Sequence, residues 1–412
     1  MKKVLVIGAG IGQYYIAKKI KERGDYLVTV TLPGKQPVID IADKVCYENV
    51  FDKEGVLAIA RREDIDAVIS DQNDLMMPTV AYVAEHMGLP GNSSSVIDSY
   101  CNKNHYRDNC DFLGIPVPRH TSVISPELPE GMRDVSFPWV VKPADSQSSV
   151  GVSKVSNTDE YKVAIVEALA HSKTHSAIVE EFFSGQELVA EGFIYKGRYY
   201  NLGFADRRYF KLKNLFIPSQ TLFPSLVPKE VLDKITMCEE KMAEYIKPEF
   251  AIVHSEYLYN PASGEYKVVE SALRGGGVYI SSHLVPLYSG IDINDVLLDC
   301  IEGKDIDMNS ILSKRNNRAA GYICFYLPAG KVVSVSGIED CRKMECIKMM
   351  EVADIHVNML APPLTHKGQR LGPILLDASS REELEENIKK VQYSLRVEVL
   401  GEDGETRRTV WD

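Results

Sequence analysis

Two apolar stretches separated by a turn constrain the fold of this chain more than any other feature of its sequence. Phe250–Tyr259 and Tyr266–Ala272 are rich in the β-branched and aromatic residues that favour strands. Asn260–Glu265 lies between them and contains proline, serine and glycine, which favour a turn. The sequence therefore predicts a β-hairpin.

This hairpin would bring two acidic side chains together. If Asn260 pairs with Tyr266, Glu256 lies directly opposite Glu270 on one face, with the Cβ atoms about 5 Å apart. Two carboxylates so placed repel each other unless a cation joins them, and Mg²⁺ commonly takes one or two protein carboxylates. The pattern predicts a magnesium site, but two solvated strand glutamates would give the same pattern, and a slip of one residue would separate them.

Basic residues stand on both sides of the hairpin in the sequence. Arg274 precedes three glycines, where the backbone can approach a ligand and a guanidinium can bind phosphate or carboxylate bidentately. Lys142 ends a buried-type strand before the small residues of Ala144–Gly151. The backbone N–H groups of this loop and the hydroxyls of Ser148 and Ser149 could donate to phosphate oxygens. A polyphosphate ligand would suit this set of groups.

A further apolar strand, Ala177–Phe183, contains Glu180 and Glu181 near its end and is followed by Glu187. The edge of such a strand could bind adenine through its backbone, and the Glu187 carboxylate could accept hydrogen bonds from ribose hydroxyls. These motifs together predict a nucleotide site.

In order and spacing, the motifs resemble those of ATP-grasp enzymes of the carboxylate–amine ligase branch, which includes L-amino-acid ligases and phosphoribosylglycinamide synthetases. The resemblance covers nearly the whole chain. It implies an α/β fold, α+β in part, in which an ATP-grasp domain lies between an N-terminal Rossmann-like preATP-grasp domain and a C-terminal β-rich domain. We place these domains at residues 1–95, 96–308 and 309–412, with a lid at about residues 120–183 of the ATP-grasp domain.

The resemblance also implies roles for individual residues. The ATP contacts would be Lys103, Lys142, Ser148, Ser149, Glu180, Glu181, Phe183 and Glu187. Glu256 and Glu270 would bind Mg²⁺, or Mn²⁺ in its place, while Arg274 and Lys142 would act on the transferring phosphate. The family's usual Glu-x-Asn-x-Arg pattern has Ala272 in place of the asparagine, which leaves open whether one or two metal ions bind. The phosphate loop also contains less glycine than that of many members.

The reaction implied is ATP-dependent formation of an amide through an acyl phosphate, with release of ADP and phosphate. The substrates would be a small carboxylate, for example an amino acid, and an amine. A ligase of the purine pathway, similar to phosphoribosylglycinamide synthetase, is the alternative within the family. A protein that binds ATP as a sensor without catalysis is the alternative outside it, suggested by Ala272 and by the atypical phosphate loop.

The first block, residues 1–95, alternates predicted strands and helices, which indicates a parallel α/β domain. Its segment Gly8–Gln13 resembles a dinucleotide fingerprint but has Gln13 where the third glycine belongs, and the strand at 27–32 is followed by no ribose-binding acid. This disfavours a dehydrogenase. Gly8–Gln13 and Asp71–Asp74 could instead contact the non-nucleotide substrate, or could serve only as turns and helix caps.

Three further residues could contact substrate. Arg208 belongs to an Arg-Arg pair at the end of a predicted strand, His254 shares a strand face with Glu256, and Gly276 follows Arg274. A solvated arginine pair and a structural histidine are the simpler interpretations. The third block carries no catalytic signature, and we expect it to close one side of the substrate cavity or to form a homodimer surface.

Composition sets limits on the class of protein. The chain has 412 residues, of which 45% are hydrophobic and 25% charged, enough for two or three domains with cores of their own. A net charge of −11 argues against nucleic acid as a partner, and the short apolar start predicts neither a signal peptide nor a membrane span. Eight cysteines without a Cys-x-x-Cys pair favour reduced thiols and a cytoplasmic location.

Overall fold

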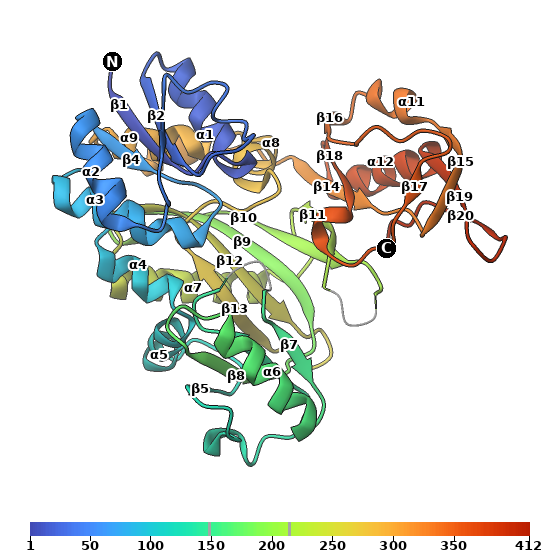
Figure 1. Cartoon of the computed structure of the whole chain (residues 1–412), viewed down its shortest axis with the longest axis horizontal. Helices are drawn as coiled ribbons and strands as arrows, with labels where there is room; N and C mark the ends of the chain where they lie inside the picture. The colour runs from blue at the N-terminus through green and yellow to red at the C-terminus, as the bar shows by residue number, and fades with distance from the viewer. Residues whose placement is uncertain (147–149, 213–215) are drawn as a thin grey trace.

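The computed structural model describes residues 1–146, 150–212 and 216–412, and these residues form four β-sheets with helices packed around them. In Figure 1 the chain from the N-terminus through β13 and α9 builds one tall column, and the C-terminal segment forms a smaller lobe at its side. This arrangement confirms the predicted α/β architecture with a Rossmann-like N-terminal part and a β-rich C-terminal part.

The first sheet is parallel and has the strand order β3-β2-β1-β4. Its strands are β1 (Lys3–Ile7), β2 (Tyr26–Thr31), β3 (Lys44–Tyr47) and β4 (Ala67–Ile69), and its helices are α1 (Ile11–Glu22), α2 (Lys53–Glu63) and α3 (Met77–Met87). Strands β1, β2 and β4 are buried on both faces, as parallel strands between helices require, whereas the edge strand β3 is largely exposed. Their carboxyl ends carry the loops at Gly8 and Asp71 toward the rest of the chain.

A second sheet, antiparallel and of order β5-β8-β6-β7, lies at the opposite end of the column (Figure 1). It is built from β5 (His120–Val123), β6 (Trp139–Pro143), β7 (Ser153–Val155) and β8 (Ala177–Glu181), and α6 (Thr158–Ala170) covers one face. A small core of its own, around Trp139 and Tyr161, holds the helix to the sheet. This part contains the residues predicted to form the lid.

The central sheet has eight strands in the order β13-β12-β9-β10-β11-β14-β18-β16. Five of them precede the C-terminal segment: β9 (Gln186–Tyr195), β10 (Arg198–Tyr209), β11 (Pro218–Phe223), β12 (Phe250–Tyr259) and β13 (Tyr266–Ala272). The predicted bounds of β12 and β13 match the structure. The helices against this sheet and around it are α4 (Ser94–Cys101), α5 (Lys103–Leu113), α7 (Lys229–Ile246), α8 (Val285–Ser289), α9 (Ile293–Ile301) and α10 (Met308–Leu312).

The C-terminal segment extends the central sheet. Its strands β14 (Ala319–Phe325), β18 (Leu371–Ala378) and β16 (Ile347–Met350) continue the sheet beyond β11. A fourth sheet, of order β17-β15-β19-β20, consists of β15 (Gly330–Ser336), β17 (Leu360–Ala361), β19 (Arg396–Leu400) and β20 (Thr406–Arg408). Helices α11 (Ile338–Arg342) and α12 (Arg381–Ser394) complete this lobe. The segment is therefore joined to the central sheet by strand pairing rather than placed over it as a separate cap.

Helix α9 connects the first sheet to the central one, because it contacts α1, β4 and β12. Lys19 and Arg23 on α1 form ion pairs with four acids of this region at 2.5–3.1 Å, namely Asp292, Asp295, Asp299 and Glu302. Apolar residues of both sheets share one core. Of the residues described, none belongs to a helix long and apolar enough to cross a membrane.

Candidate active site

The hairpin of β12 and β13 carries the two predicted metal-binding acids. Glu256 pairs with Glu270, as predicted. The predicted register at the turn is wrong, because Tyr266 pairs with Tyr259, one residue away from the expected partner. Val269 then lies in a β-bulge that adds one residue to β13 and brings Glu270 back into line with Glu256.

The backbone groups at this bulge are bonded to the segment that precedes the second sheet. The N–H of Val268 donates to the carbonyl of Pro116 at 2.9 Å. Arg107 on α5 donates from Nη2 to the carbonyl of Val269 at 2.6 Å. These bonds satisfy groups that the hairpin ladder leaves without a partner, so the bulge is fixed by α5 and the loop after it.

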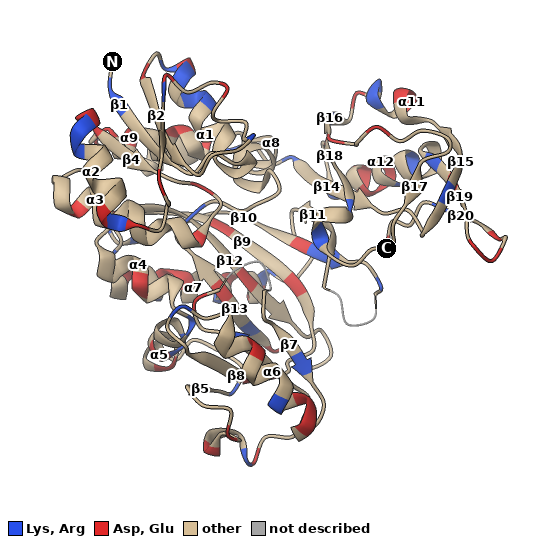
Figure 2. Cartoon of the chain, in the orientation of Figure 1, with Lys and Arg blue, Asp and Glu red and all other residues tan. Residues whose placement is uncertain are grey.

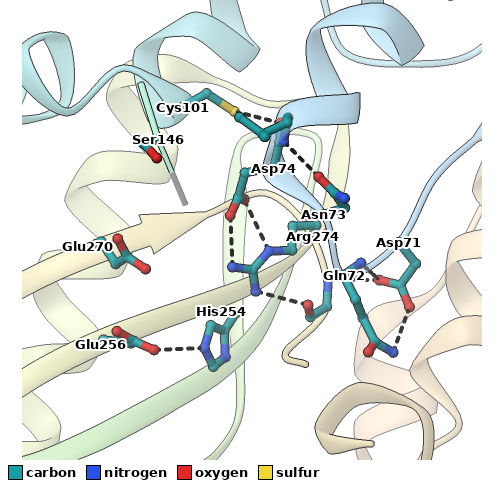
Figure 3. A network of polar contacts seen from close by, with 12 residues as sticks. Asp71, Gln72, Asn73, Asp74, Cys101, Ser146, His254, Glu256, Glu270 and Arg274 are labelled. Carbon is teal, nitrogen blue, oxygen red and sulfur yellow. Dashed lines mark hydrogen bonds and ion pairs between the residues drawn. The ribbon is translucent and has the colours of Figure 1, made fainter. Parts of the chain in front are cut away.

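Glu256 is bonded to two basic side chains of the same sheet. Arg207 on β10 forms ion pairs through Nη1 with Glu256 and, at 2.7 Å, with Glu187. The Nε2 atom of His254 lies 3.4 Å from a Glu256 oxygen (Figure 3). Burial alone would raise the pKa of Glu256, but Arg207 and His254 outweigh burial and lower it well below its usual range. Glu256 is therefore ionised, as a magnesium ligand must be.

Glu270 is more open, and its nearest cation is Lys103, whose Nζ atom lies 4.0 Å from Oε2. Ala272 pairs with His254, so position 272 supplies no side-chain oxygen beside the two acids. Within the described ranges no group of three or more His, Cys, Asp or Glu residues is arranged to hold a metal ion. Two facing carboxylates still fit one Mg²⁺, which commonly takes its other ligands from phosphate and water.

Lys103 is the first residue of α5 and lies against the loop that follows β6. Its N–H donates to the carbonyl of Ala144 at 2.9 Å, and its Nζ donates to the carbonyl of Ser146 at 2.6 Å. The predicted phosphate contacts Ser148 and Ser149 lie outside the described residues. Lys103 thus connects the start of this loop to the strand face that carries the predicted metal-binding acids.

Lys142 on β6 is buried and forms an ion pair with Glu180 on β8, with 2.7 Å between Nζ and Oε2. The other oxygen of Glu180 accepts from Nε of Arg107 at 2.7 Å. Burial alone would raise the pKa of Glu180, but the two cations lower it to about 2. Burial lowers the pKa of Lys142, while its bond to Glu180 opposes this.

The end of β8, the segment after it and the start of β9 form one wall of a cavity. Glu181 is held by its N–H, which donates to the carbonyl of Arg119 at 2.8 Å, and Glu181 and Phe183 both line the cavity. Glu187 is bonded to Arg207 and to the hydroxyl of Tyr209. Burial, and then the charge of Glu256, raise the pKa of Glu187 to about 7.

Arg274 is bound by the first block (Figure 3). Its Nε and Nη2 atoms lie 3.0 and 2.9 Å from the two carboxylate oxygens of Asp74, and Nη1 donates to the carbonyl of Gly275 at 3.0 Å. Burial would lower the pKa of Arg274, but Asp74 outweighs this and raises it. The neighbouring acid Asp71 accepts from the N–H of Gly275 at 2.9 Å. Two acids that follow β4 therefore fix the turn that follows β13.

His254 and Gly276 pack against Glu191, next to the predicted metal-binding residue Glu256. Nδ1 of His254 is bonded to Glu191, which is fully buried on β9. A Cβ atom at Gly276 would lie 2.6 Å from the Glu191 carboxylate and 2.8 Å from Nδ1 of His254. Gly277, rather than Gly276, is among the described residues that line the cavity. The structure thus places Gly276 against the His254–Glu191 pair.

The predicted substrate residue Arg208 lies at the side of the site. It is half exposed, and its Nη2 atom is 3.2 Å from Glu385 on α12. Its neighbour Arg207 is the residue that reaches the acids, and it pairs across the sheet with Glu187. The signal that sequence reasoning missed was strand alternation, since only one of two adjacent arginines can share a face with Glu187.

A cavity of about 1880 Å³ joins these groups. The predicted residues that line it are Lys103, Lys142, Glu180, Glu181, Phe183, Glu187, Arg208, His254, Glu256, Glu270 and Arg274. The C-terminal segment contributes Lys367 and Arg370, for which no sequence motif gave a signal. Figure 2 shows acidic and basic residues distributed over every part of the chain. The residues that line the cavity likewise include both signs.

Comparisons with known proteins show which proteins this chain is similar to. The family model described as the D-Ala-D-Ala ligase C-terminus matches residues 111–192. Alanine–anticapsin ligase of Bacillus subtilis is 23% identical over 62% of this chain and 58% of that ligase, so the match spans little more than half the relative's length. A formate-dependent phosphoribosylglycinamide formyltransferase of Sulfolobus acidocaldarius is 21% identical over 96% of this chain and 97% of its own length. An L-amino acid ligase from Bacillus licheniformis superposes with a TM-score of 0.80 and 20% identity, over 96% of this chain and 98% of its own.

Proposed function

Because this chain has the ATP-grasp fold, we propose that it is an ATP-dependent carboxylate–amine ligase that joins an amino acid, or another small-metabolite acid, to an amine. The observation that supports this best is the cross-strand pair Glu256 and Glu270, which lines one large cavity together with Lys103, whose Nζ atom lies 4.0 Å from Glu270. The named ligases among the similar proteins support the same reaction class.

The reaction would proceed in two steps. A carboxylate oxygen of the acid attacks the γ-phosphorus of ATP, which gives an acyl phosphate and releases ADP. The amine then attacks the acyl carbon, and phosphate leaves as the amide forms. Neither step needs a covalent bond to the protein.

Glu256 and Glu270 would hold Mg²⁺, which when bound would neutralise charge on the phosphates. Lys103 and Lys142 would bind phosphate oxygens and position the nucleotide. Arg274 is fixed by Asp74, yet each of its terminal nitrogens keeps an N–H that could donate to the transferring phosphoryl group. A guanidinium held in place before the reaction stabilises developing charge without reorganisation.

The test is magnesium-dependent release of ADP and phosphate in a panel of acids and amines. We expect turnover only when both an acid and an amine are present. Glu270→Gln should lower kcat by at least about 100-fold, because it removes one of the two metal-binding charges at the reacting phosphate. Tight binding of ATP without turnover across the panel would favour the sensor alternative over a ligase.

A second candidate function is favoured by Lys367 and Arg370. Both line the cavity, and Arg370 donates from Nη1 to the backbone carbonyl of Pro218 at 2.7 Å rather than to an acid. Two such cations suit a phosphorylated amine, which is the class of substrate named for the formyltransferase relative. The same panel separates the two candidates if it includes amines with and without a phosphate group.

A further inference from the structure

Three buried charged side chains at the cavity are linked by two ion pairs. Arg107, Glu180 and Lys142 are each at most 5% exposed. Glu180 accepts from Arg107 through one carboxylate oxygen and from Lys142 through the other, both at 2.7 Å. The three residues come from α5, β8 and β6, so the ion pairs join the second sheet to the helix that begins with Lys103.

The charges of this group matter for a phosphate site. Lys142 and Glu180 alone make a neutral pair, and a lysine neutralised by a buried carboxylate attracts phosphate weakly. Arg107 supplies a second positive charge on the far side of Glu180, which leaves the group with a net charge of +1. We propose that Arg107 is a positioning residue that cancels the charge of Glu180, so that Lys142 is held in place by Glu180 and still acts as a cation toward the nucleotide phosphates.

The contacts of Arg107 show that it acts through its neighbours. Lys142 and Glu180 line the cavity, whereas Arg107 is not among the described lining residues. Its Nη2 atom is bonded to the carbonyl of Val269, the bulge residue before Glu270. The guanidinium is therefore fixed between the hairpin and Glu180 and cannot turn toward a ligand without leaving both.

The ionisation of the group agrees with this role. Burial would lower the pKa of Arg107, but Glu180 outweighs it and raises the pKa, so the guanidinium stays charged. The pKa of Glu180 is about 2, since its two cations outweigh the effect of burial. Arg107 and Glu180 are therefore both charged at neutral pH. Burial lowers the pKa of Lys142, the third member, and its ion pair with Glu180 opposes this shift.

The proposal rests on the proposed function only in assigning Lys142 to nucleotide binding, and binding can be measured without knowing the acid or the amine. The variants are Arg107→Met, Glu180→Gln and the double variant, in the full chain. Arg107→Met leaves Lys142 neutralised by Glu180, and we expect affinity for Mg·ATP in calorimetry to fall by about tenfold or more. Affinity for adenosine, which has no phosphate, should change much less.

The double variant distinguishes an electrostatic role of Arg107 from a purely structural role. It restores the net charge of +1 while removing the same guanidinium contacts, so we expect the double variant to bind Mg·ATP at least about threefold more tightly than Arg107→Met. If Arg107 only supported the fold, a second substitution that removes another buried bond would not restore the Mg·ATP affinity lost in Arg107→Met. Arg107→Lys, which keeps the charge but cannot bridge both partners, should bind Mg·ATP within about threefold of the wild type.

Arg381, on α12 of the C-terminal lobe, offers a matched control. Like Arg107 it is buried and forms an ion pair, in its case with Asp206 on β10 at 3.0 Å. Arg381→Met should lower the melting temperature without weakening Mg·ATP binding. If Arg107→Met does not fold, Mg·ATP binding by the double variant and by Arg107→Lys is measured instead. Binding of Mg·ATP by the double variant that is no tighter than that of Arg107→Met, or unchanged binding by Arg107→Met, would overturn the inference alone. A wild type that does not bind Mg·ATP would overturn the proposed function and the inference together.

Discussion

Asp71 shows how a single buried acid joins two parts of this molecule. It follows β4 in the first block, is 1% exposed, and accepts from the N–H groups of Gly275 and Gln72, both at 2.9 Å. Burial raises its pKa to about 6, although these hydrogen bonds oppose the shift. The carboxylate thus orders the turn beside Arg274 and is itself costly to ionise.

This shift predicts how stability depends on pH. The folded state binds the Asp71 proton more tightly than the unfolded chain, whose pKa is near 3.8, so wild-type stability is lost as pH rises from about 4 to about 6. Asp71→Asn removes this loss, and its amide oxygen can still accept from Gly275. We expect the stability of the variant relative to wild type to increase by roughly 3 kcal/mol between pH 4 and pH 7.

Urea unfolding at pH 4, 5, 6, 7 and 8 measures this difference. Asp108→Asn, at an exposed position of α5, serves as the control and should follow the wild type at every pH. A constant difference between Asp71→Asn and wild type over this range would show that Asp71 does not titrate there.

At the scale of the residue, sequence patterns predicted those features of the site that depend on residues close together in the sequence. Strand alternation and a recognisable turn predicted that Glu256 pairs with Glu270, and the bulge at Val269 offsets the one-residue error in the predicted register at the turn. Arg107 carries no such signal, because its partners Glu180 and Val269 lie 73 and 162 residues away. Long-range pairing of this kind is decided by packing, which composition and periodicity do not encode.

At the scale of the element, the turn after β13 is determined by its contacts with β9 and β12. Gly276→Ala would bring a Cβ atom within 3 Å of Glu191, His254 and Ile280, so at least one of them must move. We expect a loss of about 1–3 kcal/mol of folding free energy and a lower kcat, because His254 contacts Glu256. Mg·ATP affinity should change less, since Lys103 and Lys142 are untouched.

The adjacent glycine provides the control for that substitution. A Cβ atom at Gly277 meets nothing within 4 Å, so Gly277→Ala should leave the melting temperature within about 2 °C of wild type. Equal stability of the two variants would contradict the packing argument.

Sequence patterns also predicted elements unevenly. The strands β12 and β13 were predicted with the bounds that the structure has, because turn residues separate them. The bulge at Val269 was missed, since it depends on donors and acceptors from Pro116 and Arg107. The edges of an element can be predicted from its own residues, whereas an irregularity inside it depends on its neighbours.

At the scale of the whole molecule, the C-terminal segment shares the central sheet. Every residue of β14 is buried, and β14 pairs with β11 on one side and β18 on the other. The sequence predicted a β-rich block but not this continuity, because strand partners from distant segments cannot be deduced from alternation alone. Removing the segment would expose the edge of β11 together with apolar side chains such as Leu222, which belongs to the core of the C-terminal lobe.

We therefore expect a chain that ends at residue 308 to aggregate rather than to form a stable ATP-binding monomer. Size-exclusion chromatography and binding of a hydrophobic dye measure this directly, since an unpaired strand edge and exposed core favour association. Supplying residues 309–412 as a separate chain should recover soluble protein if strand pairing is the cause. The full chain should unfold in urea without a separate early transition for the C-terminal lobe, because β11 and β14 lose their hydrogen bonds together. A monomeric chain 1–308 that binds Mg·ATP would show instead that the central sheet is complete without β14.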